Sequence, residues 1–219
     1  MLVTCWSVKG GSGTTVVAVA LAVLLSRRLD GGAMLIDAGG DVGPVLGLAE
    51  TSGSPGLADW LAAPDEVGAS ALDRLVVPAA PGLSLLTRGG SPSGALTPPP
   101  ARTEQLLAAL ADRPLVVADA GPPSAFAAEL AAASTVSLLV IRPCYLALRR
   151  ALSAPARPSG VVVVDEPKRS LDATDIEEVL GVPVQAVVPW APEIARAVDA
   201  GLLAARLPRM LAAALRAAA

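Results

Sequence analysis

The hydrophobic positions of the chain fall into short continuous runs, separated by segments in which apolar residues recur at helical spacing. The runs predict β-strands at residues 2–8, 33–37, 83–88, 114–119, 136–141, 160–165 and 182–189. The intervening segments predict helices at residues 14–29, 56–63, 67–75, 101–112, 124–133, from about 146, and 172–180, followed by two helical segments. Strands that are apolar throughout are typical of sheets buried on both faces. The pattern therefore predicts an α/β fold in one domain, residues 1–219, with a doubly wound, mainly parallel sheet and helices on both faces.

One long segment, GGSPSGALTPPP at residues 89–100, interrupts this alternation and is too rich in Gly, Ser and Pro for regular structure. We expect a surface loop there rather than a domain boundary. The longest apolar helical stretch, Val16 to Leu25, is about half the ~20 residues that a membrane span needs. The first residues also lack the pattern of a secretory signal, so we expect a cytoplasmic protein.

Composition narrows the chemistry that the chain can carry out. Hydrophobic residues make up 53% of it and aromatic residues only 2%, which indicates an aliphatic core. It has no histidine, which excludes histidine triads and imidazole zinc sites. Its two cysteines, Cys5 and Cys144, are expected to be buried thiols rather than a disulfide. The net charge of −3 argues against non-specific binding of nucleic acid.

The most informative stretch is the glycine loop that follows the first predicted strand and begins the first predicted helix. Glycines allow several backbone N–H groups to converge, and the helix dipole adds partial positive charge, so such a loop can hold an anion. A hydroxyl at the position of Thr15 is where phosphate loops bind Mg²⁺. The alternative is a plain strand-to-helix turn. The loop consists of Lys9, Gly10, Gly11, Ser12, Gly13, Thr14 and Thr15.

The loop resembles the deviant Walker A motif of the ParA/MinD family, dimeric P-loop ATPases that position chromosomes, plasmids, division sites and surface machines. In that motif an early signature lysine reaches across the dimer to the partner's phosphates, and it corresponds to Lys9. The general phosphate-loop lysine corresponds to Thr14. Only two of the 17 basic residues, Lys9 and Lys168, are lysine, so a lysine inside this loop is unlikely to be chance. The resemblance implies a homodimer and phosphate contacts from residues 9–15.

The resemblance extends to the ends of later strands. It implies catalytic roles for Lys9, Asp37 and Asp41, and the family's frequent second aspartate corresponds to Gly39. Asp119 matches a Walker B-like aspartate that, with Thr15, holds hydrated Mg²⁺. Without the resemblance, the aspartates that end strands are also common helix caps or turn residues.

The late segment GVPVQAVVPW resembles the part of the family that encloses the nucleotide base, which implies a contact from Pro189. Many family members place an asparagine after the preceding strand to recognise adenine, where this chain has Val164 and Asp165. The sequence therefore does not support adenine specificity.

Within the family the runs GDVGPVLGL, PGLADWL and LPRML resemble the CpaE/TadZ branch, whose actinobacterial members include septum-site-determining proteins. This likeness implies a spatial regulator with protein partners in a pilus, secretion or division machine. It also implies recruitment to a pole, a septum or the inner face of the membrane.

Thr14 bears on whether the site works as an ATPase. The missing lysine removes charge-assisted hydrogen bonds worth roughly 1.5–3 kcal/mol each, which weakens ATP and Mg²⁺ binding on the order of tenfold to a hundredfold. Phosphoryl transfer should suffer more, because negative charge must be stabilised in the transition state. We therefore expect a degenerate site with impaired or absent hydrolysis. The alternative is a slow but active dimeric ATPase in which Lys9 from the partner compensates.

Two further alternatives concern other parts of the chain. A redox relative of the nitrogenase iron protein needs two cysteines that bridge a cluster across a dimer, and Cys5 and Cys144 lie on unsuitable elements. The tail contains a helical apolar stripe, for which we expect packing against the sheet, with DNA or membrane contact as the alternative. That stripe and its flanking arginines are Leu207, Met210, Leu211 and Leu215 with Arg206, Arg209 and Arg216.

Overall fold

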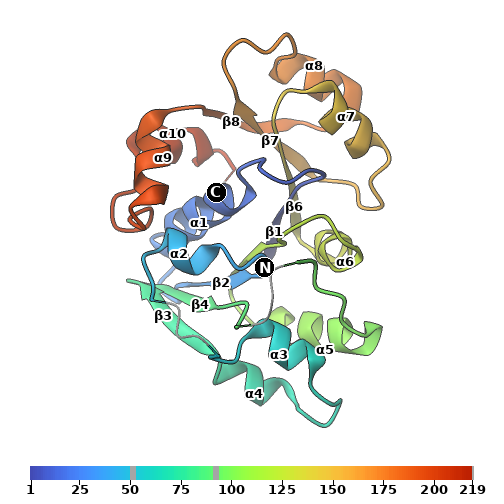
Figure 1. Cartoon of the computed structure of the whole chain (residues 1–219), viewed down its shortest axis with the longest axis vertical. Helices are drawn as coiled ribbons and strands as arrows, with labels where there is room; N and C mark the ends of the chain where they lie inside the picture. Colours follow the sequence, from blue (N-terminus) through green and yellow to red (C-terminus); the bar gives the residue numbers. More distant parts are fainter. Residues whose placement is uncertain (50–52, 91–93, 219) are drawn as a thin grey trace.

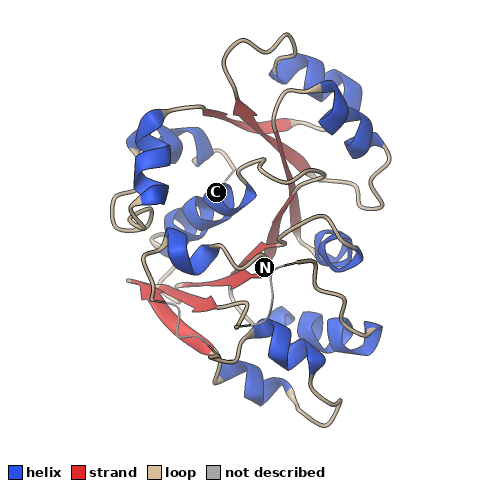
Figure 2. Cartoon of the chain, in the orientation of Figure 1, coloured by secondary structure: helices blue, strands red, loops and turns tan. Residues whose placement is uncertain are grey.

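The structure is a computed structural model that describes residues 1–49, 53–90 and 94–218. All strands found in these residues belong to one eight-stranded sheet of order β3-β4-β2-β5-β1-β6-β7-β8 (Figure 2). Each pairing is parallel except that of β3 with β4. The strands are β1 (Leu2–Trp6), β2 (Ala33–Asp37), β3 (Val76–Ala80), β4 (Leu83–Leu86), β5 (Val116–Asp119), β6 (Val136–Ile141), β7 (Gly160–Asp165) and β8 (Val184–Pro189).

Helices cover both faces of the sheet, as the sequence predicted (Figure 1). One face carries α1 (Thr14–Ser26), α2 (Val42–Val45), α9 (Pro192–Asp199) and α10 (Arg209–Leu215). The other carries α3 (Leu57–Ala62), α4 (Ala69–Asp73), α5 (Pro100–Ala111), α6 (Ala125–Ala133), α7 (Tyr145–Leu152) and α8 (Ala173–Leu180). The doubly wound architecture is confirmed.

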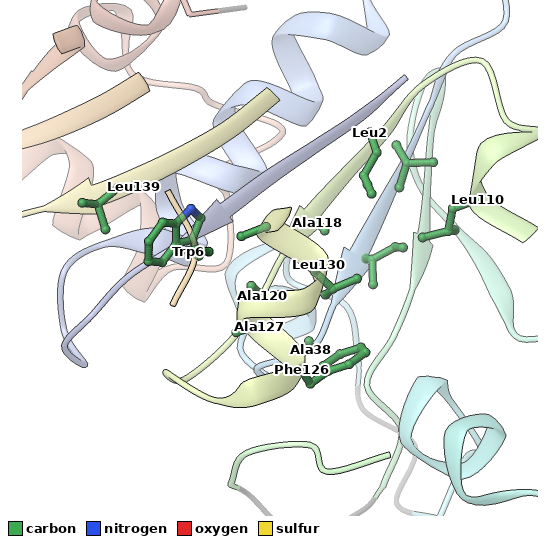
Figure 3. Close-up of a cluster of buried hydrophobic side chains, with 14 of the residues drawn as sticks. Leu2, Trp6, Ala38, Leu110, Ala118, Ala120, Phe126, Ala127, Leu130 and Leu139 are labelled. Carbon is green, nitrogen blue, oxygen red and sulfur yellow. The ribbon is translucent and has the colours of Figure 1, made fainter. Parts of the chain in front are cut away.

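Each face of the sheet has its own hydrophobic core, because successive residues of a strand point to opposite faces. Leu2 and Trp6 of β1 belong to the core under α5 and α6, part of which Figure 3 shows around Phe126 and Leu130. Val3 and Cys5 of the same strand belong to the core under α1 and α10. Burial on both faces explains why these strands are apolar at most positions, with only a few buried polar residues such as Thr4 and Ser137.

The strand β3 and the short helix α2 were not predicted from the sequence. β3 contains Pro78, which removes a ladder hydrogen bond and is typical of edge strands or non-strands. In the structure β3 is the edge strand, its pairing with β4 is irregular between Pro78 and Ala80, and its residues are half-buried or exposed. The predicted loop at 89–100 ends where α5 begins at Pro100, and residues 91–93 of that loop lie outside the described residues.

The strand order indicates at which edge of the sheet a ligand site is expected. β1 lies between β5 and β6, and the chain builds the sheet first on the β5 side and then on the β6 side. Ligands of such sheets bind at the carboxyl ends of the strands where the direction of winding changes. The residues that follow β1, β2, β5, β6, β7 and β8 meet at this edge. None of the helices in the described part of the chain has the length and apolarity to span a bilayer.

Candidate functional site

The glycine loop joins β1 to α1 and is held in shape by its own hydroxyl groups. The Ser12 hydroxyl donates to the Lys9 carbonyl oxygen at 2.8 Å, and the Ser7 hydroxyl donates to the same oxygen at 3.2 Å. Gly11 and Gly13 have φ values of 75° and 91°, the left-handed region that favours glycine. The loop therefore curls around one carbonyl group and leaves the Lys9 side chain exposed.

The beginning of α1 is suited to an anion. Gly13 occupies the N-cap position and supplies no side-chain hydrogen bond, and the first turn has no acidic residue. The backbone N–H groups of this turn have no partner inside the helix, and the helix dipole gives them partial positive charge. Thr14 is buried and contributes no charge at the position where a phosphate loop carries lysine. The cradle is thus made of backbone groups alone.

Asp119 lies at the end of β5, beside the beginning of α1, and is 1% exposed. Burial raises its pKa to about 7; the Thr15 hydroxyl and the Gly121 N–H lower it, while the charges of Asp37 and Asp41 raise it. Gly121 donates to one carboxylate oxygen at 3.2 Å, whereas Oδ2 is buried and has no hydrogen-bond partner among the described residues. A buried carboxylate oxygen without a donor favours a proton or a cation beside it.

Asp37 ends β2 directly opposite Asp119 in the ladder but has a different environment. Its two carboxylate oxygens accept N–H groups from Gly39 at 3.0 Å, Gly40 at 2.6 Å and Val42 at 3.0 Å. Burial raises its pKa more than these hydrogen bonds lower it. Asp37 therefore folds the loop that leads into α2. The turn role that the sequence left open is present in the structure.

Two neighbouring positions complete this acidic side of the site. Asp41 is exposed at the N-cap of α2, forms no side-chain cap, and acts on Asp37 through its charge. Gly39 is packed closely: a Cβ there would lie 3.3 Å from Gly121 Cα and 3.8 Å from Asp119 Oδ2. The place of the family's second aspartate is therefore directly beside the unpartnered oxygen of Asp119.

Arg88 belongs to the same region, and its role was not recognised from the sequence. It follows β4, is 5% exposed, and donates from its guanidinium to the carbonyl oxygen of Ala38. A Cβ on Gly40 would lie 3.0 Å from Arg88 Cδ. Arg88 thus supports the loop that Asp37 folds. The available signal was its position at the carboxyl end of a predicted buried strand, on the same edge as Asp37.

The other side of the glycine loop is formed by the ends of β6, β7 and β8. The Arg142 guanidinium, which follows β6, lies 4.4 Å from the centre of the Trp190 ring, which follows β8. A hydrogen bond from Arg169 lowers the pKa of Glu166, and the charges of Arg142 and Lys9 also lower it. Pro189, predicted to contact a base, is the exposed last residue of β8. This side of the loop carries charges of both signs and an aromatic ring, whereas the side of Asp37 and Asp119 is acidic.

The cysteines and the tail follow the simpler expectations in most respects. Both cysteines are free thiols, as predicted. Cys5 is buried, and burial raises the pKa of its thiol, whereas Cys144 is half-buried rather than buried and accepts the Ala147 N–H at the start of α7. In the tail Leu211 and Leu215 are fully buried in the core under α1. Packing against the sheet is confirmed for these two residues of the stripe, whereas Met210 is 39% exposed.

Comparison with known proteins identifies the fold. No protein-family model and no curated protein matches the sequence. The cell division ATPase MinD of Pyrococcus furiosus superposes with a TM-score of 0.75 at 21% identity, over 100% of this chain and 99% of that chain. A ParA family ATPase from Chlorobium tepidum gives a TM-score of 0.73 at 20% identity, over 98% and 96% of the two chains. The fold is that of the ParA/MinD ATPases.

A third structure with the same fold contains a bound nucleotide and magnesium. The septum site-determining protein MinD from Pyrococcus horikoshii, complexed with Mg-ADP, gives a TM-score of 0.74 at 18% identity, over 97% of this chain and 91% of that chain. In this chain the described residues contain no cluster of three or more His, Cys, Asp or Glu that would form a complete metal cage. Mg²⁺ usually binds to one or two protein oxygens together with phosphates and water. The Thr15 hydroxyl beside the Asp119 carboxylate, whose Oδ2 has no hydrogen-bond partner among the described residues, fits that requirement.

Proposed function

We propose that the chain is a ParA/MinD-like spatial regulator of the CpaE/TadZ type, a single domain at residues 1–219 that binds nucleotide but hydrolyses it poorly or not at all. One observation carries this proposal: an anion cradle and a buried Asp119, whose Oδ2 has no hydrogen-bond partner among the described residues, stand beside Thr14 and Gly39, two positions that lack the expected charged side chains. Groups suited to holding a magnesium nucleotide are present. Two of the charged groups that would promote its hydrolysis are missing.

Nucleotide binding is assigned to the glycine loop and its neighbours. The backbone N–H groups of residues 10–15 would hold the phosphates. Thr15 and Asp119 would hold Mg²⁺, and Pro189 would contact the nucleotide base. When bound, Mg²⁺ neutralises phosphate charge. Thr15 and Asp119 position the ion, and the low exposure of Asp119 keeps water away from that carboxylate. ATP and Mg²⁺ are the expected ligands, with affinity reduced by Thr14.

Hydrolysis is expected to be slow for two reasons that lie on the same loop edge. Thr14 supplies no positive charge to the phosphates in the transition state. Gly39 places no carboxylate beside Asp119, so the site has one acidic group fewer to orient a water molecule. Lys9, Asp37 and Asp41, the three residues expected to be catalytic, therefore have different roles in the proposed site. Lys9 supplies charge from the partner subunit, Asp37 shapes the loop through three N–H groups, and exposed Asp41 faces the solvent side of the site.

The biological role rests on the resemblance to the CpaE/TadZ branch. We propose that the protein forms a homodimer and binds protein partners of a pilus, secretion or division machine. It would act on the cytoplasmic side of a pole, a septum or the membrane. Contact with DNA or lipid through the arginines of the tail is the weaker alternative, because Leu211 and Leu215 of the apolar stripe are buried against the sheet.

Calorimetric titration with ATP and ADP, with and without Mg²⁺, followed by a turnover assay, tests this proposal. We expect Mg²⁺-dependent binding and little release of phosphate. Turnover at the rate of intact ParA/MinD ATPases would contradict the regulator. Slower turnover that requires dimerisation through Lys9 would support the second candidate, a slow but active dimeric ATPase. Absence of binding at millimolar nucleotide would contradict both.

A further inference from the structure

β8 is the last strand of the sheet, so one of its edges has no neighbouring strand (Figure 1). The Trp190 N–H donates to the Asp165 carbonyl of β7, and alternate residues of a strand direct their backbone groups to the same side. Val188 therefore also bonds toward β7, whereas the N–H and C=O groups of Val187 point away from the sheet. No hydrogen bond to these groups of Val187 is found among the described residues. Such an unpaired edge can accept a strand of another chain.

A groove of about 460 Å³ lies between α8 and this edge of β8. Val184 and Val187 line it from the strand, and Glu177 and Glu178 line it from the helix. Val188 packs in the core under α1 and α10, so the Val187 side chain points to the opposite face, the side of α8, where it is 43% exposed. The Val184 N–H donates to Glu177 Oε2 at 2.8 Å, so a helix carboxylate already bonds one end of the strand edge. The groove thus combines apolar side chains, an open backbone edge and carboxylates.

The groove is acidic. Residues 172–189 include four acidic side chains and no basic one. Asp172 and Asp175 cap the beginning of α8, each accepting the backbone N–H of the other. Glu177 and Glu178 are exposed and form no salt bridge within the described part of the chain. Two carboxylates that line the groove are therefore available to a positively charged partner.

Cations on neighbouring elements do not neutralise this charge. Arg169, in the loop before α8, pairs with Glu166, and Arg196 of α9 pairs with Glu193. Over residues 165–196 there are seven acidic and three basic residues. Other exposed cations of the loop and of α7, which packs beside α8, line no part of the groove: Lys168, Arg149 and Arg150. The acidic character of the groove is therefore a property of the folded surface as well as of the sequence.

This charge decides between the possible occupants of the edge. A second copy that paired edge to edge would bring the same carboxylates together, and like charges across an interface repel. DNA and anionic lipid are repelled for the same reason. A basic protein strand is attracted by the charge and satisfied by the open backbone edge.

We propose that the groove between α8 and β8 binds an extended segment of a partner protein that is rich in arginine or lysine. The segment adds to the sheet as a strand that pairs with Val187. Its basic side chains lay their apolar stems along Val187 and reach Glu177 and Glu178 with their charged ends. No residue of the groove belongs to the glycine loop, so this inference does not rest on the proposed binding of nucleotide.

The test uses peptides that separate charge from strand pairing. Calorimetry at low salt measures the binding of capped peptides of about seven residues, the length of a short strand, to the full chain. The probe alternates arginine and threonine. One control peptide has the same sequence with every backbone nitrogen methylated, which keeps the charge and removes the donors. The other replaces arginine by glutamate. We expect the probe to bind, the methylated peptide to bind at least about tenfold more weakly, and the glutamate peptide not to bind.

Variants of the chain locate the peptide. Glu177→Gln combined with Glu178→Gln should weaken the probe about threefold to thirtyfold, because two exposed ion pairs are lost, while glutamine at 177 still accepts the Val184 N–H. The matched control, Glu104→Gln with Glu129→Gln, removes two exposed carboxylates from α5 and α6 and should bind like the wild type. Val187→Lys adds a cation inside the groove at an exposed position and should abolish binding. Urea unfolding checks that each variant is folded.

Hydrogen exchange followed by NMR tests the pairing directly. The Val187 N–H has no partner in the described structure and should exchange quickly in the unbound protein. The probe should slow its exchange at least about tenfold. The Val188 N–H, which already bonds toward β7, should change little.

Each contrary result overturns a defined part of the inference. Equal affinity of the methylated peptide, or unchanged exchange at Val187, overturns strand pairing. Equal weakening in the two double variants overturns the location in the groove. A dimer of the nucleotide-free protein that Val187→Lys dissociates assigns the edge to a second copy. Absence of peptide binding overturns the inference as a whole, and titration of the same protein with Mg-ATP then shows separately whether the proposed function stands.

Discussion

At the scale of single residues, the two buried aspartates of the site differ in their hydrogen-bond partners. Asp119 Oδ2 is buried without a donor, while Asp37 nearby accepts three N–H groups with its two oxygens. The two carboxylates lie opposite each other in the ladder, so their difference comes from the loops that follow them. Asp119 keeps one buried oxygen without a donor among the described residues, whereas both oxygens of Asp37 accept N–H groups of its own loop.

The effect of the missing lysine can be measured by restoring it. Thr14→Lys should raise ATP affinity about tenfold to a hundredfold, because an ammonium group adds charge-assisted hydrogen bonds to the phosphates. Calorimetry with Mg²⁺ measures the change, and Thr14→Ser, which adds no charge, is the control. Turnover should rise less than affinity, since Gly39 still supplies no carboxylate. Equal affinity of Thr14→Lys and wild type would show that position 14 does not face the phosphates.

Asp119 should make stability depend on pH in the absence of Mg²⁺. Its pKa is raised from 3.8 to about 7 in the folded protein, so the folded state binds the proton more tightly than the unfolded chain. This contribution is fully present below about pH 4 and is lost as pH rises through about 7. The loss is on the order of 4 kcal/mol. Asp119→Asn, which has no carboxylate to ionise, should lose less stability between pH 5 and pH 8.

Urea unfolding at the two pH values, in a chelator, measures this difference. Asp112→Asn, at the C-cap of α5 and exposed, is the matched control and should follow the wild type. An Asp119→Asn variant that loses as much stability as the wild type would place the titration elsewhere.

At the scale of elements, α2 connects the site to the last part of the chain. The Val42 N–H donates to Asp37 at the beginning of α2, and the Val45 carbonyl accepts the Leu203 N–H at 3.3 Å at its end. Gly47 and Gly201 meet without side chains: a Cβ on Gly201 would lie 2.8 Å from Gly47 Cα. The position of the loop that contains Asp41 therefore depends on a contact with a segment more than 150 residues later in the chain.

Substitution of Gly201 tests how much this contact contributes. Gly201→Ala meets both a φ of 64° and the backbone of Gly47, so it should cost about 2–4 kcal/mol of unfolding free energy. Gly181→Ala is the matched control, because Gly181 also has a φ of 64° but a Cβ there meets nothing within 4 Å. It should cost about 1 kcal/mol. Equal losses in the two variants, measured in urea, would show that the close approach of Gly47 and Gly201 is not needed.

At the scale of the whole molecule, the strand order brings together residues that are far apart in the chain. β2, β5 and β1 are neighbours in the sheet, which places Asp37 and Asp119 beside the loop that follows residue 8. Lys9 is exposed at the same edge, where a second subunit can approach. One chain therefore brings together the aspartates at the ends of β2 and β5 and the glycine loop, and leaves the Lys9 side chain facing outward.

Lys9→Ala tests whether this lysine acts between subunits. We expect the variant to lose ATP-dependent dimerisation, because a charge that reaches the partner's phosphates is removed, while it still binds nucleotide as a monomer. Light scattering with Mg-ATP measures the mass of the complex. Lys168→Ala, which removes the other lysine in an exposed turn, should dimerise like the wild type. A Lys9→Ala dimer with wild-type stability would assign Lys9 to its own subunit or to solvent.

The sequence predicted much of the fold because its strands are buried on both faces and therefore continuous in hydrophobicity. The segments 33–37, 136–141 and 160–165 match β2, β6 and β7 at both ends. β3 escaped prediction because edge burial is partial and a proline is tolerated there. The glycine loop could also be predicted, because its motif consists of consecutive residues.

What the sequence determined by itself is therefore local: the strand and helix pattern, the glycine loop with Lys9 and Thr14, and the aspartates at strand ends. The tertiary structure decided how those aspartates differ, that Gly39 lies against Asp119, that Arg88 supports the Asp37 loop, and that Arg142 stacks on Trp190. The physical reason is that hydrogen-bond partners, burial and ring contacts depend on segments distant in the chain. A side chain's chemistry in this protein follows from its neighbours in the sheet, which no run of consecutive residues specifies.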